Sequence, residues 1–162
     1  MQDGTCPQEF EELGTLGPIE NAEVLVRVVR SPEHLTKKKE LKPSLFPLSH
    51  IRKTGVSVTR SGKMPIKELV SYVRAVAEMK DGQQLYGLRS ATAGQIRDIK
   101  LVGDRRALCV IEDPAFDIPN VPDNPAHAIA IASIGDIQED TIIEIQLALI
   151  KIFKEHELHS AD

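Results

Sequence analysis

Hydrophobic and polar positions follow two periods along this chain, and the changes of period divide it into elements. Short apolar or strictly alternating runs, which favour strands, cover residues 22–29, 56–60, 84–88, 107–111 and 126–132. Helical spacing of apolar residues covers 65–79, 93–99 and 137–156. Because helices are interspersed among strands, the pattern predicts a single α/β or α+β domain: a mixed sheet of about five strands with a long C-terminal helix packed on it.

Cap residues sharpen the helix boundaries. Pro65 is suited to the first helical position, and Thr92 can cap the short helix that follows it. For the last helix, Asp136 or Asp140 is the expected cap.

The last helix also has a wide apolar surface. One stripe consists of Ile142, Ile145, Leu149 and Ile152, and it is flanked by Ile143, Leu147 and Ile150. This is wider than one buried face needs, so we expect the flanking residues to meet either more core or a partner.

The ends of the chain differ from its middle in composition. Residues 1–21 are acidic and contain several glycines and prolines, so we expect a flexible N-terminal tail. Residues 22–156 are expected to form the globular domain, with residues 157–162 as a C-terminal tail.

A proline-rich loop, residues 113–125, separates two of the predicted strands. Its four prolines prevent continuous strand pairing, so we expect an ordered surface loop. Asp123 and Asn124 are candidate binding residues, and His127 is a candidate catalytic residue because a histidine near carboxylates can act as an acid or base. The alternative is that these side chains only fasten the turn.

Arg27 and Ser57 are the other catalytic candidates. Arg27 is the single polar residue between Val24 and Val29 of an apolar strand, so it must find a partner. Ser57 and Thr59 share one face of the next strand, and Thr59 is a further binding candidate. Arg27 and Ser57, followed by a Glu, resemble the Arg–Ser–Glu layout of ADP-ribosyltransferase-like enzymes.

In that family the Arg and Ser hold a dinucleotide and the Glu orients its ribose. The resemblance therefore implies a nucleotide site with Glu112 or Glu139 as the acid. Thr59 stands where the family has its second serine. The alternative is that Arg27 lies at a sheet edge and pairs with an acid.

Charge is unevenly distributed. The chain has 20 Lys plus Arg against 24 Asp plus Glu, a net charge of −4, which argues against general nucleic-acid binding. Residues 37–63 nevertheless hold eight cations and one acid, including the run Lys37, Lys38 and Lys39. This run is either a binding site for an acidic partner or a solvated loop.

The cysteines and the missing motifs narrow the function classes. Cys6 and Cys109 do not form a disulfide framework, and Cys109 is expected to be a buried thiol in a reducing compartment. With no signal peptide and no apolar run long enough for a membrane span, we expect the cytoplasm. No histidine spacing typical of a metal site occurs, and no motif indicates a cofactor.

Two functions remain open. We favour a small cytoplasmic, bacterial accessory protein that acts with a protein partner, or with a second copy of itself, in a multi-component system. The alternative is a small enzyme or nucleotide binder whose site combines Arg27, Ser57, Thr59 and His127 against the 113–125 loop. The sequence does not decide whether the protein is an enzyme.

Overall fold

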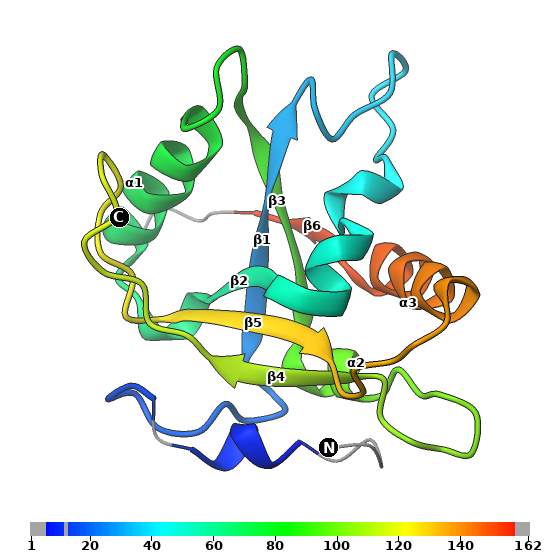
Figure 1. The fold of residues 1–162 in the computed structure, drawn as a ribbon. Coiled ribbons are helices and arrows are strands. Elements are labelled where there is room, and N and C mark those ends of the chain that lie inside the picture. The colour runs from blue at the N-terminus through cyan, green and yellow to red at the C-terminus, as the bar shows by residue number, and fades with distance from the viewer. Residues whose placement is uncertain (1–5, 12, 158–162) are drawn as a thin grey trace.

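A twisted sheet between two layers of helices forms the body of the computed structural model, which describes residues 6–11 and 13–157 (Figure 1). Its strands are β1 (Val24–Ser31), β2 (Val56–Arg60), β3 (Gln84–Thr92), β4 (Leu108–Glu112), β5 (His127–Ala132) and β6 (Lys154–His156). Its helices are α1 (Ile66–Glu78), α2 (Ala93–Arg97) and α3 (Glu139–Ile152). Short helical turns are η1 (Pro7–Phe10), η2 (Pro43–Leu45), η3 (His50–Thr54) and η4 (Ser61–Lys63).

The sheet has six strands in the order β4-β5-β2-β1-β3-β6, and every pairing in it is antiparallel. The expected single sheet with a C-terminal helix is confirmed as an α+β arrangement, but the expected mixed sheet is wrong. The sixth strand was missed because it lies within the range assigned to the last helix. Phe153 has extended backbone angles and ends α3, after which β6 pairs with Leu88–Ser90 of β3.

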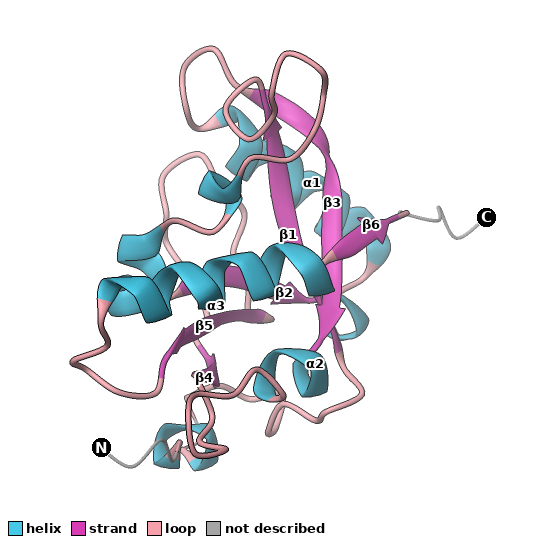
Figure 2. Ribbon diagram, turned by 90° about the vertical axis from the view of Figure 1, so that its right-hand side faces the viewer, coloured by secondary structure: helices cyan, strands magenta, loops and turns pink. Residues whose placement is uncertain are grey.

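Two apolar cores lie on the two faces of the sheet. On one face α2 and α3 cover the sheet, with Ile142 and Leu149 of α3 buried over Ala128 and Ala130 of β5. Figure 2 shows α3 crossing this face. The small alanine side chains allow close packing of the helix layer on the strands. On the other face α1 packs its own apolar side chains, which include Leu69, Tyr72 and Val73, over Val26 and Leu88.

Local sequence signals mark the starts of α1 and α2, but they do not mark the start of α3. Pro65 immediately precedes α1, and Thr92 caps α2 in a reciprocal capping box with Gln95. The expected cap of α3 is wrong, because Gln138 occupies the N-cap position and makes no side-chain cap hydrogen bond. Helix α3 is held instead by packing of its buried face.

The apolar residues of α3 divide into a buried set and an exposed set, as the width of the apolar stripe indicated. Ile142, Ile145 and Leu149 are buried, whereas Ile143 and Leu147 are 38% and 52% exposed. Part of the helix therefore presents apolar side chains to the surface.

The segment before β1, which the sequence assigned to a flexible tail, packs against the sheet in the described residues 6–11 and 13–21. Cys6 forms a disulfide with Cys109 of β4, so the expectation of unpaired thiols is wrong. Arg60, only 1% exposed, pairs with Glu23 and Glu112 and donates to the carbonyls of the same segment. These contacts join residues far apart in the sequence, and no local pattern marks them.

Gly55 sets the path from η3 into β2. Its φ is 89°, and an added Cβ would lie 2.7 Å from Cβ of Ile129, so only glycine fits there. Within the described residues, no helix is both long and apolar enough to cross a membrane. Residues 158–162, most of the expected C-terminal tail, lie outside the described part of the chain.

Candidate functional site

A cleft of about 490 Å³ lies between α1 and the proline loop, over strands β1 and β2. Figure 1 shows the loop, in yellow-green, running beside α1. Apolar side chains form most of the lining: Val26, Val28, Val58, Val76, Met79, Phe116, Ile118 and Val121. Polar groups from β1, β2, β5 and η3 complete it, among them Arg27, His50, Thr59 and His127.

Arg27 lies where β1 and β2, the two strands beneath the cleft, separate from each other. The pairing of β1 with β2 covers only Leu25 with Arg60 and Val26 with Thr59. Beyond it, Nη1 of Arg27 donates to the carbonyl of Ser57 at 2.9 Å, while Nε and Nη2 donate to the carbonyl of Leu45 at 3.2 and 2.8 Å. The guanidinium thus links β1 to β2 by one hydrogen bond and to the end of η2 by two, beyond the point where the ladder between β1 and β2 ends.

The charge of Arg27 is not neutralised by an acid. Among the described residues, no carboxylate lies within ion-pair distance of its guanidinium, which contacts carbonyl oxygens and lies over the ring of Phe46, with Cζ 5.9 Å from the ring centroid. Burial, with repulsion from Arg30, lowers the pKa of Arg27 to about 10, although the negative charge of Glu33 acts in the opposite direction. The group stays protonated at neutral pH, so a cation with no ion-pair partner in the described residues contributes to one side of the cleft.

His50 lies near this cation. Burial and the charge of Arg27 lower its pKa below the ordinary histidine value, which favours a neutral imidazole. An anion bound between the two groups would oppose this lowering of the pKa, because it would stabilise the protonated ring. The Arg27 end of the cleft is therefore suited to negative charge.

At the opposite end of the cleft, hydrogen bonds hold the proline loop to the neighbouring strands. Nδ1 of His127 lies 2.7 Å from the carbonyl and 3.2 Å from the carboxylate of Asp113, whose own amide donates to the carbonyl of His127. Buried Asn124 donates to the hydroxyl of Thr59 and accepts from the amide of Ala126. Both ends of the loop are thus tied to β2 and β5, the fastening role that the sequence left open for His127.

Asp123 has a similar local contact. Its carboxylate accepts a hydrogen bond from the amide of Asp117 at 3.0 Å, inside the loop. This is turn chemistry of the kind that Asp supplies in many loops. A ligand-binding role for Asp123 stays a prediction.

Four predicted residues come together here, since Arg27, Ser57, Thr59 and His127 all line the cleft. The acid of the Arg–Ser–Glu arrangement does not join them. Glu112 binds Arg60 and the amide of Gly14, while Glu139 lies at the start of α3 beside a different cavity.

The basic run lies elsewhere. Lys37, Lys38 and Lys39 occupy an exposed turn that does not line the cleft. Their role in binding stays a prediction.

Several cleft residues were missed by the sequence reading. Tyr72 and Met79 follow the helical spacing of α1, so nothing separates them from core positions in the sequence. His50 lies in a segment to which the sequence analysis assigned neither helix nor strand, and only its proximity to Arg27 in space connects the two. Burial raises the pKa of Tyr72, so its hydroxyl is a neutral donor at the cleft wall.

Comparison of the chain with models of protein families, with curated proteins and with solved structures gave no match. The functional argument therefore depends on the geometry of the cleft.

Proposed function

We propose that this protein is a binding protein for a small amphipathic anion, which it holds in the cleft between α1 and the proline loop. The observation that carries the proposal is the guanidinium of Arg27, which is bonded to carbonyls and has no acidic partner in the described residues. The side chain of Arg27 is half-buried, and a cation in such a place favours a counter-ion, because the local dielectric constant is lower than that of water. A carboxylate or phosphate head group supplies this counter-charge.

The remaining lining favours an apolar body for the ligand. Valine, methionine and phenylalanine side chains dominate the walls, and a volume of about 490 Å³ is in the ordinary range for small-molecule sites. Burial of an alkyl chain gains roughly 0.8 kcal/mol for each methylene group. The proposed ligand is therefore a medium-length alkyl or aryl chain with one anionic end.

Rigidity of the loop supports binding. Its ends are fixed by His127 with Asp113 and by Asn124 with Thr59. A wall that is already ordered loses little conformational entropy when a ligand binds. We assign no catalytic step to His127 or Thr59, whose contacts with Asp113 and Asn124 fasten the loop.

A charge series tests the proposal. Decanoate, decanol and decylammonium share one tail and differ in head-group charge. We expect decanoate to shift the backbone amide signals of Val28, Val76 and Ala115 saturably, with affinity at least about tenfold higher than that of decanol, equivalent to about 1.4 kcal/mol. Decylammonium should bind more weakly than decanol. Equal affinity for all three would contradict a role for Arg27 in ligand recognition.

A second candidate is the protein-partner role. The exposed side chains of Ile143 and Leu147 on α3 favour it, because large apolar side chains gathered on one helix face are typical of interaction surfaces. Sedimentation of the chain at several concentrations tests self-association through this face. A concentration-independent monomer would remove the homo-oligomer form of this proposal.

The cellular compartment stays a prediction. The cytoplasm was expected from three features of the sequence: unpaired cysteines, no signal peptide and no apolar run long enough for a membrane span. The disulfide between Cys6 and Cys109 counts against that expectation, since disulfides persist mainly in oxidising compartments.

A further inference from the structure

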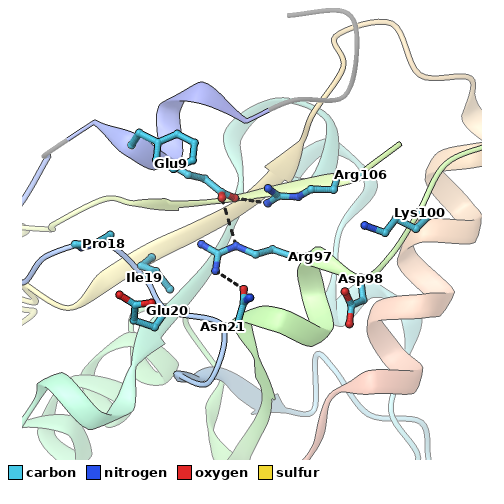
Figure 3. Close-up of a pocket in the computed structure, with 10 residues that line it drawn as sticks. Glu9, Pro18, Ile19, Glu20, Asn21, Arg97, Asp98, Lys100 and Arg106 are labelled. Carbon is cyan, nitrogen blue, oxygen red and sulfur yellow. Dashed lines mark hydrogen bonds and ion pairs between the residues drawn. The ribbon is translucent and has the colours of Figure 1, made fainter. Parts of the chain in front are cut away.

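A second cavity of about 530 Å³ lies beside the N-terminal segment, and the carboxylate of Glu9 stands at its wall (Figure 3). Glu9 Oε2 accepts a hydrogen bond from the amide of Val110 at 2.6 Å and pairs with Nη2 of Arg106. Its Oε1 lies 3.3 Å from Nε of Arg97, whose Nη1 donates to Asn21. The carboxylate is 7% exposed, so two cations and one amide converge on a buried anion.

The carboxylate of Glu9 and the amide of Val110 meet at the open edge of the sheet. In the described part of the chain β4 is a terminal strand, and it pairs with β5 alone. The amide of Val110 points away from that pairing and is taken by Glu9 rather than by a neighbouring strand. A sheet edge with unpaired backbone groups is a ready docking site for another segment.

Residues 7–11 make few apolar contacts with this edge, whereas Cys6 and Ile19, on either side of them, are buried. Phe10 is 86% exposed and Leu13 51%, so they contribute little buried area. On one side of Glu9 the segment is fixed by the disulfide from Cys6 to Cys109, and on the other by the amide of Gly14 on Glu112. Removal of the disulfide leaves the contacts of Glu9 as the main attachment of residues 6–11.

We propose that Arg97, Arg106 and the amide of Val110 form a carboxylate-recognition site that the chain's own Glu9 occupies, and that the Cys6–Cys109 disulfide keeps it occupied. After reduction, the site accepts an external peptide segment that carries a carboxylate in the place of Glu9. The inference is independent of the anion cleft, which lies between α1 and the proline loop.

The redox step needs a dithiol as reductant. One dithiol thiolate attacks a sulfur of the disulfide and forms a mixed disulfide, which releases one protein thiolate. The second dithiol sulfur then displaces the other protein sulfur. The products, after protonation, are the thiols of Cys6 and Cys109 and one molecule of oxidised dithiol, so two electrons pass from the dithiol to the protein.

Two measurements test the proposal. The first uses the full chain with Cys6→Ser and Glu9→Gln, which lacks both the covalent link and the internal carboxylate. A capped peptide with the sequence of Pro7–Phe10 is the probe, and the same peptide with Gln in place of Glu is its control. We expect the acidic peptide to shift the amide signal of Val110 saturably, with at least about tenfold higher affinity than the control. The wild-type disulfide form should not respond.

The second measurement uses the wild-type chain reduced by dithiothreitol. We expect iodoacetamide to alkylate both cysteines at least about tenfold faster than the chain unfolds globally, because the segment opens locally. Alkylation no faster than global unfolding would overturn the proposal, whether or not the double variant folds. Equal affinity of the folded double variant for both peptides, or no binding of either at 10 mM (about the weakest affinity such a titration resolves), would also overturn it.

Discussion

Arg27 and Ser57 are joined by a hydrogen bond of 2.9 Å from the guanidinium to the main-chain carbonyl, at the point where the pairing of β1 with β2 has ended. This contact holds two diverging strands at a fixed spacing and leaves a cationic group at the cleft. The same residue thus serves the fold and, in our proposal, the ligand.

We therefore predict that Arg27→Leu destabilises the protein by about 2–4 kcal/mol, because the carbonyls of Leu45 and Ser57 lose their charged donor. The stability of Arg27→Lys should lie between that of Arg27→Leu and that of the wild type, because lysine keeps the positive charge but lacks the planar guanidinium group. Urea unfolding measures both. Arg74→Leu, at an exposed position of α1, is the matched control and should change stability by less than about 0.5 kcal/mol. Equal stability of the two leucine variants would show that the Arg27 contacts are not structural.

The disulfide gives a second prediction. Cys6 and Cys109 are 103 residues apart in sequence, so their link restricts the unfolded chain strongly. Reduction should lower the free energy of unfolding by roughly 4 kcal/mol. Unfolding curves with and without a reductant measure this difference. A thiol assay in denaturant without reductant should find no free cysteine, and two free thiols would contradict the pairing.

The buried ring of His34 predicts a pH dependence. Its Nδ1 accepts the amide hydrogen of Arg30, and burial lowers its pKa from 6.5 to about 4. The unfolded chain therefore binds a proton that the folded chain excludes, and stability falls as the pH drops from about 6.5 towards 4.5. The loss from this residue is at most about 1.4 kcal/mol per pH unit.

The comparison with His34→Gln isolates this contribution, because the amide oxygen can still accept from Arg30 while the side chain does not titrate. The variant should show a flatter stability profile between pH 6.5 and 4.5. Glu23 and Glu33 have pKa values below 4.5 and contribute only at lower pH. Parallel profiles for the variant and the wild type would show that His34 titrates normally in the folded chain.

A pair of substitutions tests the two faces of α3. Ile145 is 3% exposed and Leu147 is 52% exposed. Ile145→Asp should cost about 3–5 kcal/mol because it buries an unpaired charge, whereas Leu147→Asp should cost less than about 0.5 kcal/mol. Thermal unfolding of the two variants gives the comparison. A melting temperature of Ile145→Asp equal to that of the wild type would contradict the packing described here.

Sequence periodicity predicted those parts of the fold that depend on near neighbours. Helix α1 and strand β5 carry clear periods, and Thr92 marks the start of α2 with its own side chain. Strand β6 has no such signal, because Lys154–His156 is short and polar and is defined only by its partner β3. The antiparallel order of the strands likewise depends on long-range pairing.

The sequence predicted several of the residues that line the candidate site, but it did not predict the contacts that these residues make. Arg27 stood out as a charge in an apolar strand, and the structure places it in one cleft with His127. Its partners, the carbonyls of Leu45 and Ser57, could not be inferred, because main-chain groups leave no mark in the sequence. The same holds for Cys6, whose partner lies 103 residues away.

The most direct test of the account is a titration of decanoate followed by the guanidinium NMR signal of Arg27. Two variants define the site: Val76→Trp fills the cleft from α1, and Val102→Trp places the same side chain at a position that is 96% exposed and outside it. We predict a saturable shift of the Arg27 signal in the wild type and in Val102→Trp, and at least about tenfold weaker binding in Val76→Trp. No saturable shift in the wild type, or equal affinity in both tryptophan variants, would contradict the proposal that the cleft binds an amphipathic anion.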